Sequence, residues 1–140
     1  MSLEKYSDYL DIADYYTPNQ KEAVKITGAA DAKAAAKILG NYFESPIVKV
    51  DKDGCIGIEN GEAFFVKSID EFKNVDSTGA GDAFLSGFMY GLFYDYDIKD
   101  CVLFGNITGG KAVTKVGALS GYVNEKELIE LSKKYKGNIE

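Results

Sequence analysis

A glycine-rich segment with two carboxylates, residues 76–82, is the part of the sequence best suited to chemistry. It reads Asp76-Ser77-Thr78-Gly79-Ala80-Gly81-Asp82 and leads into an apolar helical pattern. Glycines free the backbone to present several N–H groups at a helix N-terminus, where an anion such as a phosphate binds. Asp82 would lie beside that anion and accept a proton from an attacking hydroxyl. On spacing alone, a glycine turn before an acidic helix start explains the segment equally well.

Two other glycine-rich segments match phosphate-binding patterns only in part. Residues 79–84 begin like the dinucleotide fingerprint G-x-G-x-x-G, but Phe84 replaces the third glycine and removes the close helix–strand packing of that motif. Residues 105–112 match G-x-x-x-x-G-K, yet Ala112 lacks the hydroxyl with which a P-loop holds Mg²⁺. The apolar residues around this second segment also recur at helical spacing. We therefore expect neither a Rossmann dehydrogenase nor a P-loop nucleotide site.

Composition excludes several classes of function. The 140 residues contain no histidine, which removes Ser-His-Asp and Cys-His catalysis and the commonest zinc ligand. A net charge of −6 argues against nucleic-acid binding, and no apolar stretch is long enough to cross a membrane. Cys55 and Cys101 lack the spacing of a zinc site or a redox pair, so we expect both thiols to serve in packing. Two free thiols without a signal peptide favour a cytoplasmic location.

The hydrophobic periodicity and the turn signals predict strands that alternate with helices. Asn60-Gly61 favours a type I′ turn and hence a hairpin, and Asp31 and Asn124 are expected helix caps. The expected elements are a strand at 12–16, a helix from 19 to 28, a helix from 31 to 43, a strand at 47–50, a hairpin of 55–59 and 63–66, and helices from 82 to 93, from 98 to 114 and from 124 to 136. This order indicates an α/β layer with a parallel sheet and one hairpin.

Two of these helices have an apolar face. In the helix at 31–43, one face consists of Ala35, Ile38, Leu39 and Tyr42. In the helix after Asp82, six apolar residues recur at helical period and form a broad stripe: Phe84, Leu85, Phe88, Met89, Leu92 and Phe93.

Three segments of the sequence carry a family resemblance. Residues 76–84 closely resemble the D-T-x-G-A-G-D-x-F signature of the ribokinase-like (PfkB) carbohydrate kinases, with Ser77 as one conservative change. Residues 17–23 look like the N-x-x-E motif of that family, and residues 112–118 resemble its C-terminal A-V-T-(K/R)-x-G-A loop. The three segments occur in the order of the family, and the resemblance covers nearly the whole chain.

The resemblance implies ATP-dependent phosphorylation of a sugar hydroxyl. Asp82 would be the general base, and the backbone amides of Gly79, Ala80 and Gly81 would form the anion hole that holds the transferred phosphate. Asn19 and Glu22 would organise Mg²⁺ and the triphosphate through water, although an ordinary acidic helix start explains these two residues on their own. Asn106 falls where the family lines the adenine pocket, and a polar residue on a partly exposed helix explains it equally well.

The resemblance also implies a monovalent cation, for which K⁺ is the candidate. The positions that match the cation site of the family bind largely through carbonyl oxygens, and a cation there would support the anion hole electrostatically. These positions are Asp76, Thr78, Ala112, Lys115 and Gly117.

Two positions depart from the family pattern. Asp51 stands in a turn near the nucleotide phosphates where the family usually has glycine, and a carboxylate there repels a triphosphate unless a metal intervenes. On the far side of the cation loop, Gly121 stands where the family often has serine.

Length is the larger departure, because the sugar-binding half and the lid of the family are missing. The expected fold is a ribokinase-like three-layer α/β sandwich with a mostly parallel sheet, truncated to its C-terminal half across residues 1–140. Such a chain should be a poor kinase by itself, since catalysis of this kind depends on positioning. A non-catalytic nucleotide-binding or subunit-association module is the alternative. We also expect the chain to self-associate or to pair with the missing half, because truncation exposes an edge or an apolar face.

Overall fold

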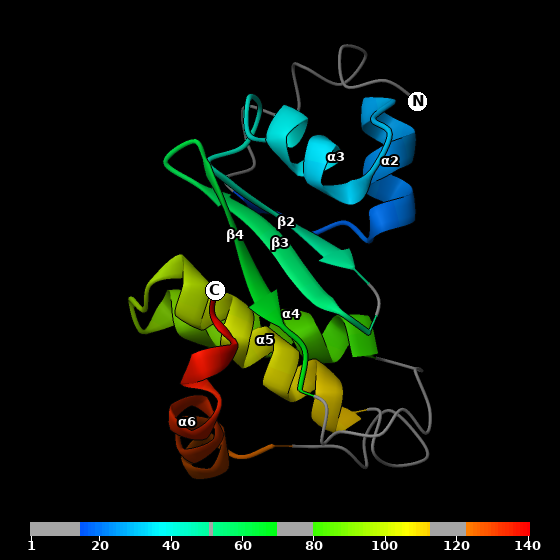
Figure 1. The fold of residues 1–140 in the computed structure, drawn as a ribbon. Coiled ribbons are helices and arrows are strands. Elements are labelled where there is room, and N and C mark those ends of the chain that lie inside the picture. The colour runs from blue at the N-terminus through cyan, green and yellow to red at the C-terminus, as the bar shows by residue number, and fades with distance from the viewer. Residues whose placement is uncertain (1–14, 51, 70–79, 113–122) are drawn as a thin grey trace. The chain divides into compact units, whose positions relative to one another are not determined.

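The computed structural model describes residues 15–50, 52–69, 80–112 and 123–140, with only the backbone of Ala80 and Ala112 (Figure 1). The chain forms two compact units, residues 1–65 and 66–140. The first contains β1 (Tyr15–Tyr16), α2 (Gln20–Thr27), α3 (Ala32–Leu39), β2 (Ser45–Val50), β3 (Gly54–Glu59) and the start of β4 (Glu62–Lys67). The second contains α4 (Ala80–Phe93), α5 (Ile98–Ala112), α6 (Glu125–Lys134) and the 3-10 turn η2 (Lys136–Asn138). No helix in the described ranges is long and apolar enough to span a membrane.

The sheet is mixed, with the order β1-β2-β3-β4. β1 runs parallel to β2, with Tyr15 opposite Ser45, and β2 runs antiparallel to β3, with Ile47 opposite Gly57. The expected hairpin turn is confirmed, because β3 ends at Glu59 and β4 begins at Glu62. Both turn residues, Asn60 and Gly61, have the positive φ angles that a type I′ turn requires, 51° and 79°.

The core of the first unit lies where α2 and α3 cover the sheet (Figure 1). Alanines dominate the helical side of this contact, so the helix backbones approach the strands closely and branched or aromatic side chains fill the remaining space. The ring of Tyr16 in β1 stacks on Phe43 with 5.0 Å between centroids. The buried cluster consists of Ala23, Ala35, Ala36, Leu39, Phe43, Val48 and Ile58.

The helix expected at 31–43 ends earlier than the periodicity suggests. It stops at Leu39, and Gly40 is its C-cap. The N–H groups of Asn41 and Tyr42 then bond to the carbonyls of Ile38 and Leu39, three residues back, so the last turn tightens. As a result Phe43 enters the core while Tyr42 is 38% exposed. The prediction that the helix reaches residue 43 and carries Tyr42 on the same face as Ala35 and Leu39 was therefore wrong.

In the second unit, α4 and α5 lie side by side and approach each other through glycines (Figure 1). A Cβ on Gly87 would lie 2.3 Å from the carbonyl oxygen of Phe104, and a Cβ on Gly91 would lie 2.7 Å from the Sγ of Cys101. Gly105 leaves room for the Phe84 ring in the same way. The two helices are thus in backbone contact, and any side chain larger than hydrogen at Gly87 would separate them.

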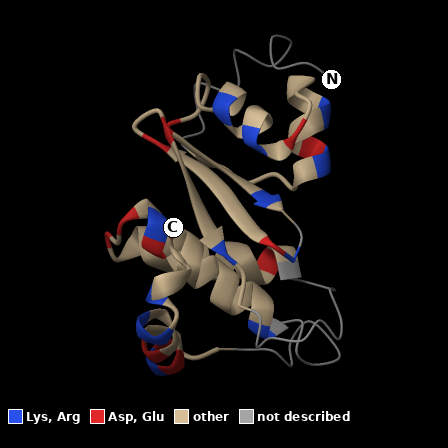
Figure 2. Cartoon of the chain, in the orientation of Figure 1, with Lys and Arg blue, Asp and Glu red and all other residues tan. Residues whose placement is uncertain are grey.

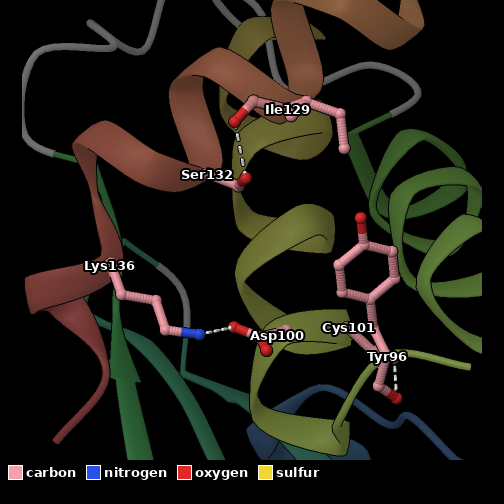
Figure 3. Close-up of polar contacts among 6 residues, drawn as sticks. All are labelled: Tyr96, Asp100, Cys101, Ile129, Ser132 and Lys136. Carbon is pink, nitrogen blue, oxygen red and sulfur yellow. Dashed lines mark hydrogen bonds and ion pairs between the residues drawn. The ribbon is translucent and has the colours of Figure 1, made fainter.

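Polar contacts hold α6 and the chain end against the other helices. Tyr90 donates from its hydroxyl to Glu125 at 2.8 Å, and Lys111 pairs with Glu127 at 3.0 Å. Lys136 pairs with Asp100, as Figure 3 shows. In Figure 2, α6 carries both signs of charge while α4 has only Asp82 near its start. The last helix was expected to reach residue 136, but it ends at Lys134 and a 3-10 turn follows.

Both cysteines are buried and unoxidised, in line with the packing role expected from their spacing. Burial raises the pKa of the Cys55 thiol to about 12, although nearby Lys49 lowers it. Burial and the carboxylate of Asp100 raise the pKa of Cys101 to about 11. The Sγ of Cys101 lies 3.5 Å from the carbonyl oxygen of Tyr96 and donates to it (Figure 3).

The glycine contact yields a stability prediction. Alanine is the better helix former by about 1 kcal/mol, so propensity alone predicts that Gly87→Ala stabilises α4. The contact with the Phe104 backbone predicts the opposite, a net loss of about 1–3 kcal/mol in the free energy of unfolding. Urea unfolding, monitored by circular dichroism, measures this change in the free energy of unfolding. Gly137→Ala is the matched control, because a Cβ at that position meets nothing within 4 Å. Equal or greater stability of Gly87→Ala would contradict the close contact.

Candidate functional site

Asp82 lies in the first turn of α4 and is exposed to solvent. It is the acidic residue of that turn, and the last turn of α4 contains no basic residue. The first N–H groups of a helix have no partner within the helix, and the helix dipole adds partial positive charge there. A carboxylate at a helix N-terminus can accept a proton next to a phosphate that binds there.

Thr108 ties this turn to α5. Its buried hydroxyl lies 2.5 Å from the carbonyl oxygen of Ala83, the residue after Asp82, and 3.1 Å from the carbonyl oxygen of Phe104. The contact with Ala83 joins the two helices at the turn that carries the carboxylate. Thr108 is not among the site residues that the sequence predicts. The available signal was the spacing of Gly87 and Gly91, which places small residues on one side of α4.

In the first unit, Asn19 and Glu22 form a complete capping box at the start of α2. The Oδ1 of Asn19 accepts from the Glu22 N–H at 2.9 Å, and the Asn19 N–H donates to the Glu22 Oε2 at 3.0 Å. The backbone of Asn19 also forms an isolated parallel β-bridge with Lys49 of β2. Burial, and secondarily the Glu22 charge, raises the pKa of Tyr16. Through the capping box, Asn19 and Glu22 have a structural role whether or not they also bind a ligand.

Asn106 makes structural hydrogen bonds from α5 to the end of β4. Its Nδ2 donates to the carbonyl oxygens of Val66 at 3.1 Å and Lys67 at 3.4 Å. Asn138 donates to the carbonyl oxygens of Lys67 and Ser68, each at 3.2 Å. The hydrogen bonds to Val66 and Lys67 account for the partly buried Asn106 on α5. A role of Asn106 in adenine binding stays a prediction.

The P-loop-like segment at 105–112 lies within α5 and not in a loop. Lys111, the residue that would bind phosphate in a P-loop, pairs with Glu127. The expectation that this match is not a P-loop is confirmed, because residues 105–112 are helical, and a helical backbone directs its N–H groups along its own axis and cannot surround a phosphate.

Several predicted site residues lie outside the described residues. They are Asp51, Asp76, Thr78, Gly79, Lys115 and Gly117. Ala80 and Ala112 are placed by backbone alone, at the first position of α4 and the last of α5. The anion hole and the cation loop therefore remain predictions.

The comparisons with known proteins decide the family. The family model for pfkB family carbohydrate kinases matches residues 1–125. The chain belongs to this family. An uncharacterised sugar kinase of Archaeoglobus fulgidus is 34% identical over 106 residues, which cover 76% of this chain and 42% of that protein. A ribokinase of Haemophilus influenzae is 28% identical over 129 residues and 88% of this chain, again 42% of its own length.

The solved structures support the ribokinase-like α/β fold predicted from the motifs. The crystal structure of a ribokinase from Thermotoga maritima matches with a TM-score of 0.78 and 28% identity, over 91% of this chain and 44% of that one. The chain thus spans less than half the length of the curated relatives and solved structures described here.

The capping box yields a second stability prediction. Asn19→Ala should lower the free energy of unfolding by about 1 kcal/mol, because the N–H of Glu22 loses its acceptor. Glu22→Gln keeps an oxygen that accepts from Asn19 and should stay within about 0.5 kcal/mol of the parent chain. Denaturant unfolding of the two variants checks both values. A loss of similar size in Glu22→Gln would mean that the carboxylate charge, and not the hydrogen bond, stabilises the helix start.

Proposed function

We propose that this chain is the nucleotide-binding, C-terminal half of an ATP-dependent carbohydrate kinase. The single observation that carries the proposal is Asp82, exposed in the first turn of α4 within the segment that resembles the family signature. In the proposed reaction, Asp82 accepts the proton of a sugar hydroxyl while the hydroxyl oxygen attacks the γ-phosphorus of ATP and ADP leaves. The backbone amides of Gly79, Ala80 and Gly81 hold the transferred group, and Gly79 and Gly81 also contact the nucleotide.

Asn19 and Glu22 are proposed to organise Mg²⁺ and the triphosphate through water. The donor set fits this role, because Glu22 is exposed and uses only its Oε2 in the bond to Asn19. Mg²⁺ keeps several of its own waters and binds such outer carboxylates readily. When bound, the ion neutralises charge on the phosphates. Asn106 is proposed to contact the adenine in addition to its structural bonds.

K⁺ is proposed to bind at Asp76, Thr78, Ala112, Lys115 and Gly117. The positive charge of the ion would stabilise an anion bound in the anion hole electrostatically. The proposed substrate is a small sugar, with no nucleic acid or membrane partner, and the proposed location is the cytoplasm.

A non-catalytic module derived from a sugar kinase is the second candidate. Asp51 favours it, because a carboxylate where the family has glycine would repel the triphosphate. The two candidates differ in what they require of Asp82, since only phosphoryl transfer needs a proton acceptor there.

Nucleotide binding is testable on the chain itself. We expect calorimetric titration with Mg·ADP to detect binding that is tighter in potassium than in sodium. Glu22→Gln should weaken the binding about tenfold, as loss of an outer-shell carboxylate does for metal sites. A chain that melts cooperatively by circular dichroism but binds no Mg·ADP would contradict the nucleotide site. Unchanged affinity in Glu22→Gln would leave Glu22 with its capping role alone.

The role of Asp82 requires a protein that can hold the sugar. The joined protein for this test replaces the matching 44% of the Thermotoga maritima ribokinase with this chain. In it, Asp82→Asn should lower the rate of ribose-dependent ADP formation by about 10²–10⁴-fold, because the proton acceptor is lost. Its Mg·ADP affinity should be unchanged or tighter. Asp95→Asn, the same chemical change two residues after the end of α4, is the control and should leave the rate unchanged. Equal rates for the two variants would falsify the general-base role.

A further inference from the structure

The buried hydroxyl of Thr108 lies within hydrogen-bond distance of three carbonyl oxygens. Two belong to its own helix α5, Phe104 at 3.1 Å and Gly105 at 3.2 Å. The third is the carbonyl oxygen of Ala83 in α4, at 2.5 Å. A hydroxyl has one proton to donate, and Ala83 is the nearest of the three acceptors. The side chain of Thr108 therefore links the two helices.

Neither partner of this bond needs it for its own hydrogen bonding. A threonine inside a helix ordinarily donates to a carbonyl three or four residues back, and Gly105 and Phe104 offer both. The carbonyl of Ala83 lies inside α4, where the helix ladder pairs it with the N–H of Gly87. Removal of the bond leaves no buried group unpaired, so the bond acts on the position of α4 against α5.

The bond holds α4 in its first turn, where a helix is least secured by its own hydrogen bonds. The first N–H groups of a helix have no partner within it, and helix ends open locally at little cost. Ala83 belongs to that turn and follows Asp82 directly. A tertiary bond to Ala83 therefore limits the movement of the backbone that carries Asp82.

The contact also depends on a position without a side chain. A Cβ on Gly87 would lie 2.4 Å from the hydroxyl oxygen of Thr108 and 2.3 Å from the carbonyl oxygen of Phe104. Glycine at position 87 thus gives the hydroxyl access to the carbonyl of Ala83, one turn earlier in α4. Asp82 itself is exposed, so its carboxylate stays accessible while its backbone is held.

We propose that Thr108 is a positioning residue for phosphoryl transfer, an inference that rests on the proposed function. Through the carbonyl of Ala83, Thr108 holds the first turn of α4 so that the carboxylate of Asp82 meets the sugar hydroxyl. Thr108 is buried, and it lies outside the three segments that carry the family resemblance. Misplacement of a reacting group by about 1 Å costs up to about 10²-fold in rate. Loss of the Thr108 hydroxyl should therefore lower kcat and leave KM unchanged.

Two substitutions at position 108 isolate the hydroxyl, because Thr108→Ser keeps it, Thr108→Ala removes it, and both lose the methyl group. In the joined protein described above, kcat for ribose-dependent ADP formation should be about tenfold lower in Thr108→Ala than in Thr108→Ser, with equal KM for ATP and for ribose. Ser132→Ala is the control, because the Ser132 hydroxyl donates to Ile129 within α6 at 2.7 Å, and it should leave kcat unchanged (Figure 3). Equal kcat in the two variants at position 108 would overturn the proposal.

A role that acts through Asp82 makes the two changes non-additive. In the Asp82→Asn background, Thr108→Ala and Thr108→Ser should have equal kcat, because no carboxylate is left to position. A difference that persists undiminished in that background would show that Thr108 acts on another part of the protein, and this result also overturns the proposal.

Hydrogen exchange on the isolated chain measures the hold on the first turn without any catalysis. Relative to Thr108→Ser, Thr108→Ala should speed exchange of the amides of residues 84–87 at least about fivefold and leave those of residues 88–93 unchanged. An equal increase along the whole of α4 reports a loss of global stability and overturns the proposal. Local opening in a joined protein that forms no ribose-dependent ADP contradicts the proposed function alone. ADP formation that is equal in the two variants contradicts the positioning role alone.

Discussion

The backbone contact between α4 and α5 is the constraint on which the second unit depends. Gly87 and Gly91 let α5 approach to a distance that no side chain permits, and the hydroxyl of Thr108 then reaches the carbonyl of Ala83. Because Asp82 precedes Ala83, the same contact sets the position of the carboxylate proposed as the base. A close glycine contact is suited to holding Asp82 in place, because two helices in backbone contact have little freedom to slide. A contact made by long side chains, in contrast, can repack.

In both units, residues proposed for chemistry also hold the fold. Asn19 and Glu22 satisfy each other's backbone groups at the start of α2, and Asn106 links α5 to the end of β4. This double use has a physical reason. A helix start offers unsatisfied N–H groups that attract either a capping side chain or a ligand anion, so capping residues and ligand-binding residues occupy the same places. Local hydrogen bonding therefore does not by itself distinguish a structural residue from a functional one.

The two sides of α4 differ in their burial. Phe84 and Phe88 are buried in the core of the second unit, whereas Met89 and Phe93 are exposed. Beyond Asp82 in its first turn α4 carries no charge, so its exposed side favours contact with another apolar surface.

The sequence by itself determined the order and type of the elements, the Asn60-Gly61 turn and the caps at Asp31 and Asn124. It also determined the family, through its three motifs. These features depend on residues within a few positions of one another. The tertiary structure alone decided which side of the α4 pattern is buried, that α3 ends at Leu39 so that Phe43 replaces Tyr42 in the core, and that Thr108 anchors the turn after Asp82. Periodicity shows that a helix side is apolar, but its burial depends on which distant segment packs against it, and that choice is made by long-range contacts.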